Sequence, residues 1–292
     1  YRYDRFKKNT SAPRVLVWPK AADSKRVLRL ANSTYLVRDL VNAPAETLGP
    51  AELAAAAKKV GTAHGAKTTI IRGKKLEKEY PMVHAVGRAS SRAPLYVDLR
   101  WGKAKDPKVT LVGKGVIFDS GGLDIKPGSG MLTMKKDMGG AAHAIALASA
   151  IMDAKLPVRL RLLVPCVENS ISGNAFRPMD IYKSRKGITI EIGNTDAEGR
   201  LILCDALADA AEEKPEFILD FATLTGAARV ALGADLPALF CNDELLATEF
   251  IAGGQQAHDP VWRMPLHADY GRYLENNMAD TSNISSTSYG GA

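Results

Sequence analysis

Asp196, Glu198 and Arg200 stand at alternate positions in one short segment of the chain. The segment follows ITIEI at 188–192, a β-branched run that predicts a strand. Two carboxylates just after a strand can supply oxygen ligands to a divalent cation, and the arginine can anchor an anion beside it. A capping box between Thr195 and the glutamate is the structural alternative, but it leaves the aspartate and the arginine unexplained.

A second segment, VGKGVIFDSGG at 112–122, places Lys114 and Asp119 in an otherwise apolar run. Buried charges must be paired or bound to metal, so two interpretations stand: an ion pair between these two residues, or ligands to a cation. The segment lacks the glycine and lysine spacing of phosphate-binding loops. A Ser120 nucleophile is disfavoured, because neither a GxSxG elbow nor accompanying histidine and aspartate segments occur.

A third segment places Lys126, Met134 and Asp137 ahead of a predicted helix at 139–154. Read alone, Asp137 would cap this helix and Lys126 would lie in solvent. Together with the three acids above, Asp137 completes a set of four carboxylates, whose mutual repulsion is tolerable only beside cations. Two divalent ions are the natural number for such a set, and its hard ligands suit Zn²⁺, Mn²⁺ or Mg²⁺ without choosing among them.

The elements that must position these segments alternate along the chain. Periodicity and composition predict helices at 23–41, 50–61, 139–154, 198–213 and 243–256, and strands at 67–72, 95–101, 109–113, 158–167, 188–192, 216–223 and 237–242. This alternation predicts an α/β fold, with a largely parallel mixed sheet and helices on both faces. Ligands bind beyond the carboxyl ends of such strands, so the loops after 109–113, 188–192 and the buried strand 216–223 are where chemistry is expected. Residues 280–292 are expected to form a polar loop-like tail.

Composition excludes several classes of protein. With 46% hydrophobic and 24% charged residues the chain is typical of soluble globular proteins, and no apolar run reaches the about 18 residues of a membrane span. Cys166, Cys204 and Cys241 are far apart with apolar flanks, which favours a reducing cytoplasm over a disulfide framework. No HExxH zinc motif occurs. The net charge of +7 is scattered in lysine pairs, which favours a solvated surface over a nucleic-acid site.

The three segments together resemble the leucyl (cytosol) aminopeptidase family of di-metal peptidases. The motifs are NTDAEGRL at 194–201, GKGVIFDSGG at 113–122 and MKKDMGGAA at 134–142, with weaker ones at 42–50, 220–227 and 259–266. The resemblance implies a three-layer catalytic domain at 21–292, preceded at 1–20 by a remnant of an interdomain connection. It also implies truncation at both ends: the family's N-terminal domain is absent, as is the C-terminal part that completes the sheet and the first-residue pocket.

The resemblance further implies a role for each candidate residue. Asp119, Asp196 and Glu198 would bind one divalent ion, and Lys114, Asp119, Asp137 and Glu198 the other, with Mn²⁺ or Zn²⁺ as the ions. Lys114 would coordinate as a neutral amine, its pKa strongly lowered by burial beside two cations. Lys126 would stabilise the developing gem-diolate oxygen, and Arg200 would anchor a bicarbonate ion acting as general base.

The resemblance also implies the substrate and the assembly. Met134 and Thr223 would line an apolar pocket for the first side chain of a peptide with a free N-terminus, and the Leu224 C=O and Gly226 N–H would bind its main chain. The expected activity is release of N-terminal, leucine-like residues by a cytoplasmic homo-hexamer without membrane contact. A non-catalytic or DNA-binding role is the alternative, since some bacterial relatives bind DNA and this chain is basic; the intact Lys126 and Arg200 favour catalysis.

Overall fold

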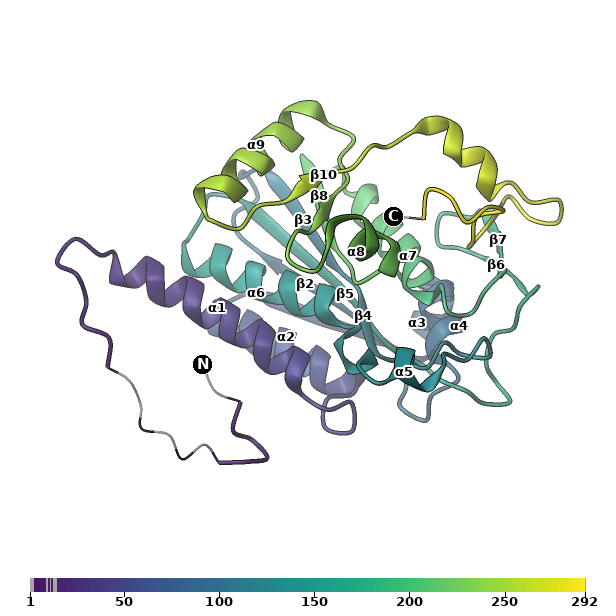
Figure 1. The fold of residues 1–292 in the computed structure, drawn as a ribbon, viewed down its shortest axis with the longest axis horizontal. Helices are drawn as coiled ribbons and strands as arrows, with labels where there is room; N and C mark the ends of the chain where they lie inside the picture. The colour runs from purple at the N-terminus through teal and green to yellow at the C-terminus, as the bar shows by residue number, and fades with distance from the viewer. Residues whose placement is uncertain (1–2, 9, 11, 13–14, 292) are drawn as a thin grey trace.

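The computed structural model describes residues 3–8, 10, 12 and 15–291 (Figure 1). Within the predicted remnant at 1–20, positions 1–2, 9, 11 and 13–14 lie outside the described residues, and the others form no helix or strand. The first regular element is α1 (Ser24–Asn42), where Asp23 caps the helix by accepting a hydrogen bond from the Arg26 N–H. The predicted helix at 23–41 is thus confirmed.

A six-stranded sheet forms the centre of the molecule, in the order β1-β2-β5-β3-β8 with β4 paired to β5. Its strands are β1 (Lys67–Arg72), β2 (Leu95–Trp101), β3 (Lys108–Gly113), β4 (Gly115–Asp119), β5 (Arg159–Asn169) and β8 (Phe217–Phe221). The pairs β3–β5, β4–β5 and β3–β8 are parallel, whereas β1–β2 and β2–β5 are antiparallel. The prediction of a largely parallel mixed sheet is therefore confirmed.

Helices cover both faces of this sheet (Figure 1). One face carries α1, α2 (Pro50–Ala63) and α6 (Gly139–Asp153), and the other carries α3 (Gly73–Glu79), α4 (Pro81–Gly87) and α7 (Glu198–Glu212). Alternate residues of β5 serve the two cores: Leu162 belongs to the first and Leu163 to the second, as the pleat of a strand requires. The expected three-layer arrangement is confirmed.

The start of α6 lies directly against the sheet, next to the candidate residues. A Cβ on Gly140 would stand 2.0 Å from the Phe221 carbonyl oxygen, and one on Gly113 would stand 2.6 Å from the Ala141 Cα. The Ala141 N–H donates to the Lys114 carbonyl at 2.9 Å. Glycine at both positions therefore allows the α6 N-terminus to meet the end of β3, which brings the segment before α6 to the sheet edge.

Several predicted strands differ from the observed ones. The run at 188–192 forms β7 (Thr189–Glu191), which lies in a separate small sheet between β6 (Ile181–Lys183) and β11 (Thr281–Ser282). The prediction that 280–292 is only a loop-like tail is wrong at β11, because two residues carry no periodicity that a sequence could reveal. The strand predicted as buried at 216–223 is β8, the half-exposed edge of the sheet.

The remaining elements complete the described chain. The predicted strand at 237–242 shortens to β9 (Ala238–Leu239), parallel to β10 (Trp262–Arg263), and the predicted last helix is α9 (Glu244–Gln256). The short helices α5 (Gly128–Met131) and α8 (Gly226–Leu232) and the 3₁₀ turns η1 (Met134–Lys136) and η2 (Ala268–Leu274) were not expected. Among the described residues no helix has the length and apolarity to cross a membrane, and the three cysteines are free.

The middle of α7 is anchored by Asp205, whose side chain is fully buried. Its carboxylate accepts hydrogen bonds from the Met82 N–H and the Arg185 N–H, each at 2.8 Å. Burial raises the pKa of Asp205 to about 6, although these N–H groups act in the opposite direction. The helix that begins with Glu198 is thus tied to α4 through an acid that ionises with difficulty.

We expect stability to depend on the ionisation of Asp205. In the unfolded chain the Asp205 carboxyl has a pKa of about 4. Between about pH 4 and pH 6 the unfolded chain therefore binds fewer protons than the folded protein. The free energy of unfolding consequently falls as the pH rises through this range. The expected loss is about 2 kcal/mol, and Asp205→Asn should lack it. Urea unfolding of both proteins from pH 4 to pH 7 measures the difference, and parallel pH profiles would contradict the assignment.

Candidate metal centre

The four predicted carboxylates gather beyond the carboxyl end of β4. Asp119 is the last residue of β4, Asp137 follows η1, and Glu198 is the first residue of α7. All three are buried, with 3%, 2% and 1% exposure, whereas the side chain of Asp196, in the loop before α7, is 31% exposed. The structure therefore brings together acids that are up to 79 positions apart (198 minus 119) in the sequence.

Lys114 lies between two of these carboxylates. Its Nζ is 2.7 Å from Asp137 Oδ2 and 3.1 Å from Glu198 Oε1, and it donates to the Thr223 carbonyl oxygen at 3.1 Å. A Cβ on Gly199 would stand 2.4 Å from the Lys114 Cε, so the first turn of α7 needs glycine to admit this side chain. The alternative of a Lys114–Asp119 ion pair is wrong: the lysine pairs with acids from α7 and from the segment before α6.

Lys126 contacts the other two carboxylates. Its Nζ is 2.9 Å from Asp119 Oδ2 and also contacts Asp196 Oδ1. Burial lowers the pKa of Lys126, but the hydrogen bonds and charges of these two carboxylates outweigh it and raise the pKa above its usual value. The alternative that placed Lys126 in solvent is therefore wrong, since its side chain is only 15% exposed.

The cluster holds more negative charge than the two lysines neutralise. The pKa of Glu198 is raised to about 7, mainly by burial; the charges of Asp119 and Asp137 add to this effect and that of Lys114 opposes it. Burial and Asp119 likewise raise the pKa of Asp196 despite Lys126. Four carboxylates against Lys114, Lys126 and the half-exposed Lys136, which is 3.3 Å from Asp137 Oδ1, leave a net charge of −1 when all are ionised, and this excess of negative charge favours binding of a cation.

The arrangement of oxygen atoms fits a divalent cation. Asp119, Asp196 and Glu198 each offer one carboxylate oxygen, and these oxygens lie within 4.8 Å of one another. Glu198 Oε2 is buried without a hydrogen-bond partner among the described residues. A buried carboxylate oxygen without a donor is costly unless a cation approaches it, and hard oxygen ligands are those preferred by divalent ions.

The family resemblance implies a lowered pKa for Lys114, but this does not hold in the absence of a bound cation. Burial lowers its pKa, but Glu198 and Asp137 outweigh that effect, so the pKa of Lys114 is raised. Cations among these same carboxylates would neutralise the charges that raise it. Coordination by a neutral Lys114 amine thus depends on the ions themselves, whose binding would be accompanied by loss of the lysine proton.

Both capping alternatives are wrong. The N-cap of α7 is Ala197, and Thr195 instead donates to the Gly121 carbonyl oxygen at 2.6 Å and accepts from the Asp124 N–H at 2.8 Å. The N-cap of α6 is Met138, which makes no side-chain cap, and the Asp137 carboxylate faces the cluster. Thr195 therefore ties the loop after β4 to the loop before α7.

One residue of the site carries no motif in the sequence. Asn169, the last residue of β5, is 1% exposed and donates through Nδ2 to Asp119 Oδ1 at 2.9 Å and to the Thr195 carbonyl oxygen at 3.0 Å. It orients the Asp119 carboxylate and connects the end of β4 to the loop before α7. Its position at the carboxyl end of a central strand is the signal that could have found it.

Of the four predicted substrate residues, Thr223 contacts the carboxylate cluster, and the others lie close to Asp137 or to Thr223 in the sequence. The Thr223 hydroxyl donates to Asp137 Oδ1 at 2.7 Å and so orients this carboxylate. The Thr223 methyl group lies next to Gly139, where an added Cβ would be 3.3 Å from it. Met134 is half-buried in η1, and Leu224 is 43% exposed on the loop between β8 and α8. Gly226 is the first residue of α8, where helix N–H groups lack intrahelical acceptors.

Arg200 lies in the first turn of α7, two residues after Glu198. Its guanidinium donates through one terminal nitrogen to the Asn283 carbonyl oxygen at 2.8 Å. Burial lowers the pKa of Arg200, while the charge of Glu198 acts in the opposite direction. The arginine is therefore held between the tail segment and the cluster, with donors left for an anion.

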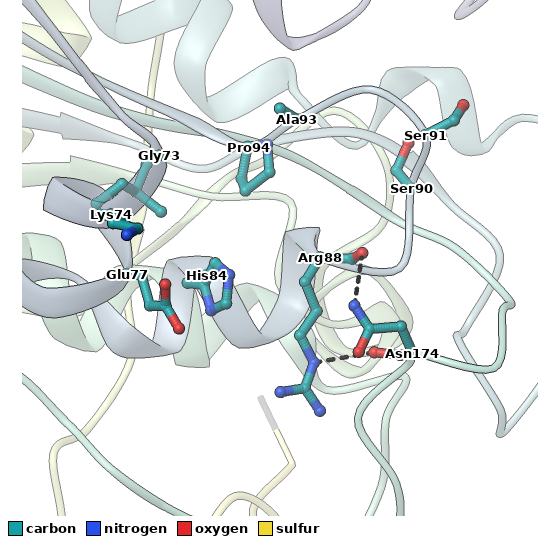
Figure 2. Close-up of a pocket in the computed structure, with 11 residues that line it drawn as sticks. Gly73, Lys74, Glu77, His84, Arg88, Ser90, Ser91, Ala93, Pro94 and Asn174 are labelled. Atoms are coloured by element: carbon teal, nitrogen blue, oxygen red, sulfur yellow. Dashed lines mark hydrogen bonds between the residues drawn. The ribbon is translucent and has the colours of Figure 1, made fainter.

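A separate hollow of about 360 Å³ lies between α3, α4 and the segment after α4 (Figure 2). Figure 2 shows that Arg88, which lines this hollow, is hydrogen-bonded to Asn174; the Arg88 Nε donates to the Asn174 carbonyl oxygen at 2.9 Å. The Arg88 guanidinium also donates to the Tyr182 hydroxyl at 3.0 Å. None of the predicted site residues lines this hollow. The carboxylate cluster is therefore the candidate functional site.

Comparisons with known proteins agree on one family. The sequence model of the cytosol aminopeptidase family, catalytic domain, matches residues 35–292. The probable cytosol aminopeptidase of Burkholderia lata is 43% identical over 263 residues, which is 89% of this chain and 52% of that protein. The chain thus spans about half the length of this curated relative.

Solved structures agree with the sequence comparisons. The crystal structure of the Coxiella burnetii cytosol aminopeptidase superposes with a TM-score of 0.97 at 54% identity, covering 100% of this chain and 64% of that one. The bottromycin maturation enzyme BotP in complex with Mn superposes with a TM-score of 0.91 at 38% identity, covering 99% of this chain and 64% of that one.

Proposed function

The chain belongs to the cytosol aminopeptidase family, and we propose that it carries the catalytic centre of a metal-dependent aminopeptidase that releases N-terminal, leucine-like residues from peptides. The observation that carries this proposal is the buried carboxylate cluster at the carboxyl end of the sheet, in which Glu198 Oε2 has no hydrogen-bond partner within the described part of the chain. Because the chain covers only part of its relatives, the activity of a whole protein is part of the proposal.

We assign the ligands of two ions within the cluster. Asp119, Asp196 and Glu198 would hold one ion, which their oxygens within 4.8 Å of one another support, and Lys114, Asp119, Asp137 and Glu198 would hold the other. Mn²⁺ is supported by the Mn complex of BotP, and Zn²⁺ suits the same donors. When bound, such ions supply an activated water and polarise the carbonyl of the scissile peptide.

Two cationic side chains would assist the reaction. Lys126 would donate a hydrogen bond to the oxygen that becomes negative as the peptide carbonyl is attacked, because its ammonium group already reaches Asp119 and Asp196, two of the proposed ligands. Arg200 would hold a bicarbonate ion that accepts the proton of the attacking water, because its guanidinium retains donors beyond the bond to Asn283. No protein carboxylate is then required as general base.

The substrate is proposed to bind along the loop after β8 and at η1. The Leu224 carbonyl oxygen would accept from the substrate main chain, and the N–H of Gly226 at the start of α8 would donate to it. Met134 and the methyl group of Thr223 would contact the first side chain. A free α-amino group would contact the metal centre, which explains the proposed preference for unblocked peptides.

Organisation, assembly and location follow from the family resemblance. We propose residues 21–292 as the catalytic domain, after a connecting remnant at 1–20, and a homo-hexamer as the assembly. A cytoplasmic location is supported by the free Cys166, Cys204 and Cys241 and by the name of the Burkholderia lata relative, a probable cytosol aminopeptidase.

Hydrolysis of leucine para-nitroanilide by the metal-stripped protein tests the proposal, with Mn²⁺, Zn²⁺ or Mg²⁺ added back and the N-acetylated substrate as the comparison. Cleavage is expected only with added metal and only of the free amine. Equal cleavage of the acetylated substrate, or activity without metal, would contradict it. Two equivalents of metal bound without cleavage would show that this chain alone is insufficient for turnover.

A further inference from the structure

The loop between β7 and α7 is held by a residue from the far end of the chain, Asn283. This asparagine is 3% exposed and lies just after β11. Its Oδ1 accepts from the Gly193 N–H at 2.8 Å and the Asn194 N–H at 3.2 Å, while its Nδ2 donates to the Asn194 carbonyl oxygen at 2.7 Å. One side chain therefore satisfies both donors and an acceptor of the loop main chain.

The backbone of Asn283 extends this contact in both directions. Its N–H donates to the Glu191 carbonyl oxygen at 3.1 Å, which continues the pairing of β11 with β7. Its carbonyl oxygen accepts from Arg200 at 2.8 Å. The next residue, Ile284, packs so closely on Gly193 that a Cβ there would stand 2.4 Å from it. The segment thus spans the loop from its entry at β7 to the first turn of α7.

The contact is transmitted to the proposed ligands through Asn194. The Asn194 Oδ1 accepts from the Asp196 N–H at 2.6 Å, so the main chain of Asp196 follows the position of Asn194. The Asn283 Nδ2 also lies 3.4 Å from the carbonyl oxygen of Ala197, the N-cap of α7 that precedes Glu198. In the part of the chain that the structure describes, no side chain caps α7, so the loop depends on this external support.

We propose that Asn283 is a positioning residue for the metal centre: it fixes the 193–197 main chain so that the carboxylates of Asp196 and Glu198 reach the same ion. This inference rests on the proposed function for its metal role. An amide side chain suits the task because it combines an acceptor with donors, whereas a carboxylate has only acceptors and an aliphatic side chain has neither. Groups that orient metal ligands typically change metal affinity by about 10–100-fold when they are removed.

Asn283→Leu, of similar size but without hydrogen-bonding groups, tests the proposal, with Asn283→Asp as a second variant. The matched control is Asn276→Leu, because Asn276 anchors the same tail by donating to Glu191 Oε1 at 2.7 Å, and its other side-chain hydrogen bonds among the described residues are with the N–H groups of Met278 and Ala279. In metal-stripped protein, Asn283→Leu should accelerate amide hydrogen exchange of Gly193 and Asn194, and the control should not.

Titration with Mn²⁺ supplies the second readout. Asn283→Leu is expected to weaken Mn²⁺ binding by about 10–100-fold, with kcat recovering towards the unmodified value at saturating Mn²⁺. Asn283→Asp keeps the acceptor for both N–H groups and should show a smaller loss. If the leucine variant does not fold, the aspartate variant against unmodified protein gives the same comparison.

The outcomes separate this inference from the proposed function. Unchanged exchange, or faster exchange with unchanged Mn²⁺ affinity, would overturn the positioning role while leaving the proposed function intact. An equal loss of affinity in Asn276→Leu would also overturn it, since general loosening of the tail would then be the cause. If the unmodified protein binds no Mn²⁺, Zn²⁺ or Mg²⁺, the proposed function fails, and the metal role of Asn283 fails with it.

Discussion

Replacing Glu198 by alanine is expected to lower turnover of leucine para-nitroanilide by about 10³-fold or more, because metal-centred activation of water and carbonyl supplies several kcal/mol of transition-state stabilisation. Glu198 is assigned to both ions, is 1% exposed, and has one oxygen near Lys114 and the other without a hydrogen-bond partner among the described residues. Its removal would delete the ligand that the proposed function assigns to both ions. Metal analysis of the purified variant should show less than two equivalents.

The matched control for this substitution is Glu212→Ala. Glu212 is at the other end of α7, where its half-exposed carboxylate pairs with Arg185 at 2.9 Å. This variant should retain full metal content and turnover, because exposed ion pairs contribute at most about 1 kcal/mol. Two bound equivalents with more than a tenth of the activity in Glu198→Ala would show that this glutamate does not bridge the ions.

Most of the layered fold could be predicted from the sequence because each long element has its own signal. The helical spacing at 23–41 and the mostly apolar run at 158–167 that becomes β5 are local patterns, and the structure confirms both. The position of a strand within a sheet is not local. The run that becomes β8 is as apolar as a central strand, yet it lies half-exposed at the edge, because only the order of the strands decides which one is outermost.

The sequence indicates the acids and lysines that the structure brings together in the candidate site, but not how they pair. The sequence places Lys114 five positions before Asp119, which suggests an ion pair between them. The observed partners, Asp137 and Glu198, are delivered by the N-terminal ends of two helices from opposite faces of the sheet. Such a meeting depends on how closely glycine lets α6 approach the sheet, which is a property of the packed structure.

Asn169 and Asn283 escaped prediction for a related reason. Asn169 donates to the carboxylate of Asp119 and to a backbone carbonyl of a distant loop. Asn283 bonds backbone N–H and carbonyl groups of the same loop. Such partners leave no spacing pattern in the sequence. Asn283 also lies in a polar stretch whose composition is typical of a loop. An asparagine that is almost fully buried in such a stretch is informative only once its burial is known.

Lys126→Ala is expected to lower kcat by about 10²–10³-fold, the usual effect of removing one donor to a developing oxyanion, while metal content is retained. The Lys126 ammonium lies between Asp119 and Asp196, two proposed ligands, so it also competes with cations for their negative charge. Its loss should leave Mn²⁺ affinity unchanged or higher. This direction is opposite to that expected for the loss of a metal ligand.

Steady-state kinetics and Mn²⁺ titration of Lys126→Ala separate these two roles, with Lys136→Ala as the control. Lys136 also contacts a carboxylate of the cluster, at 3.3 Å from Asp137 Oδ1, but its side chain is 38% exposed. Its removal should change kcat by less than about fivefold, because a half-exposed ion pair contributes at most about 1 kcal/mol. Weaker Mn²⁺ binding in Lys126→Ala, to the extent seen in Glu198→Ala, would contradict an electrophilic role and make the lysine a structural part of the metal centre.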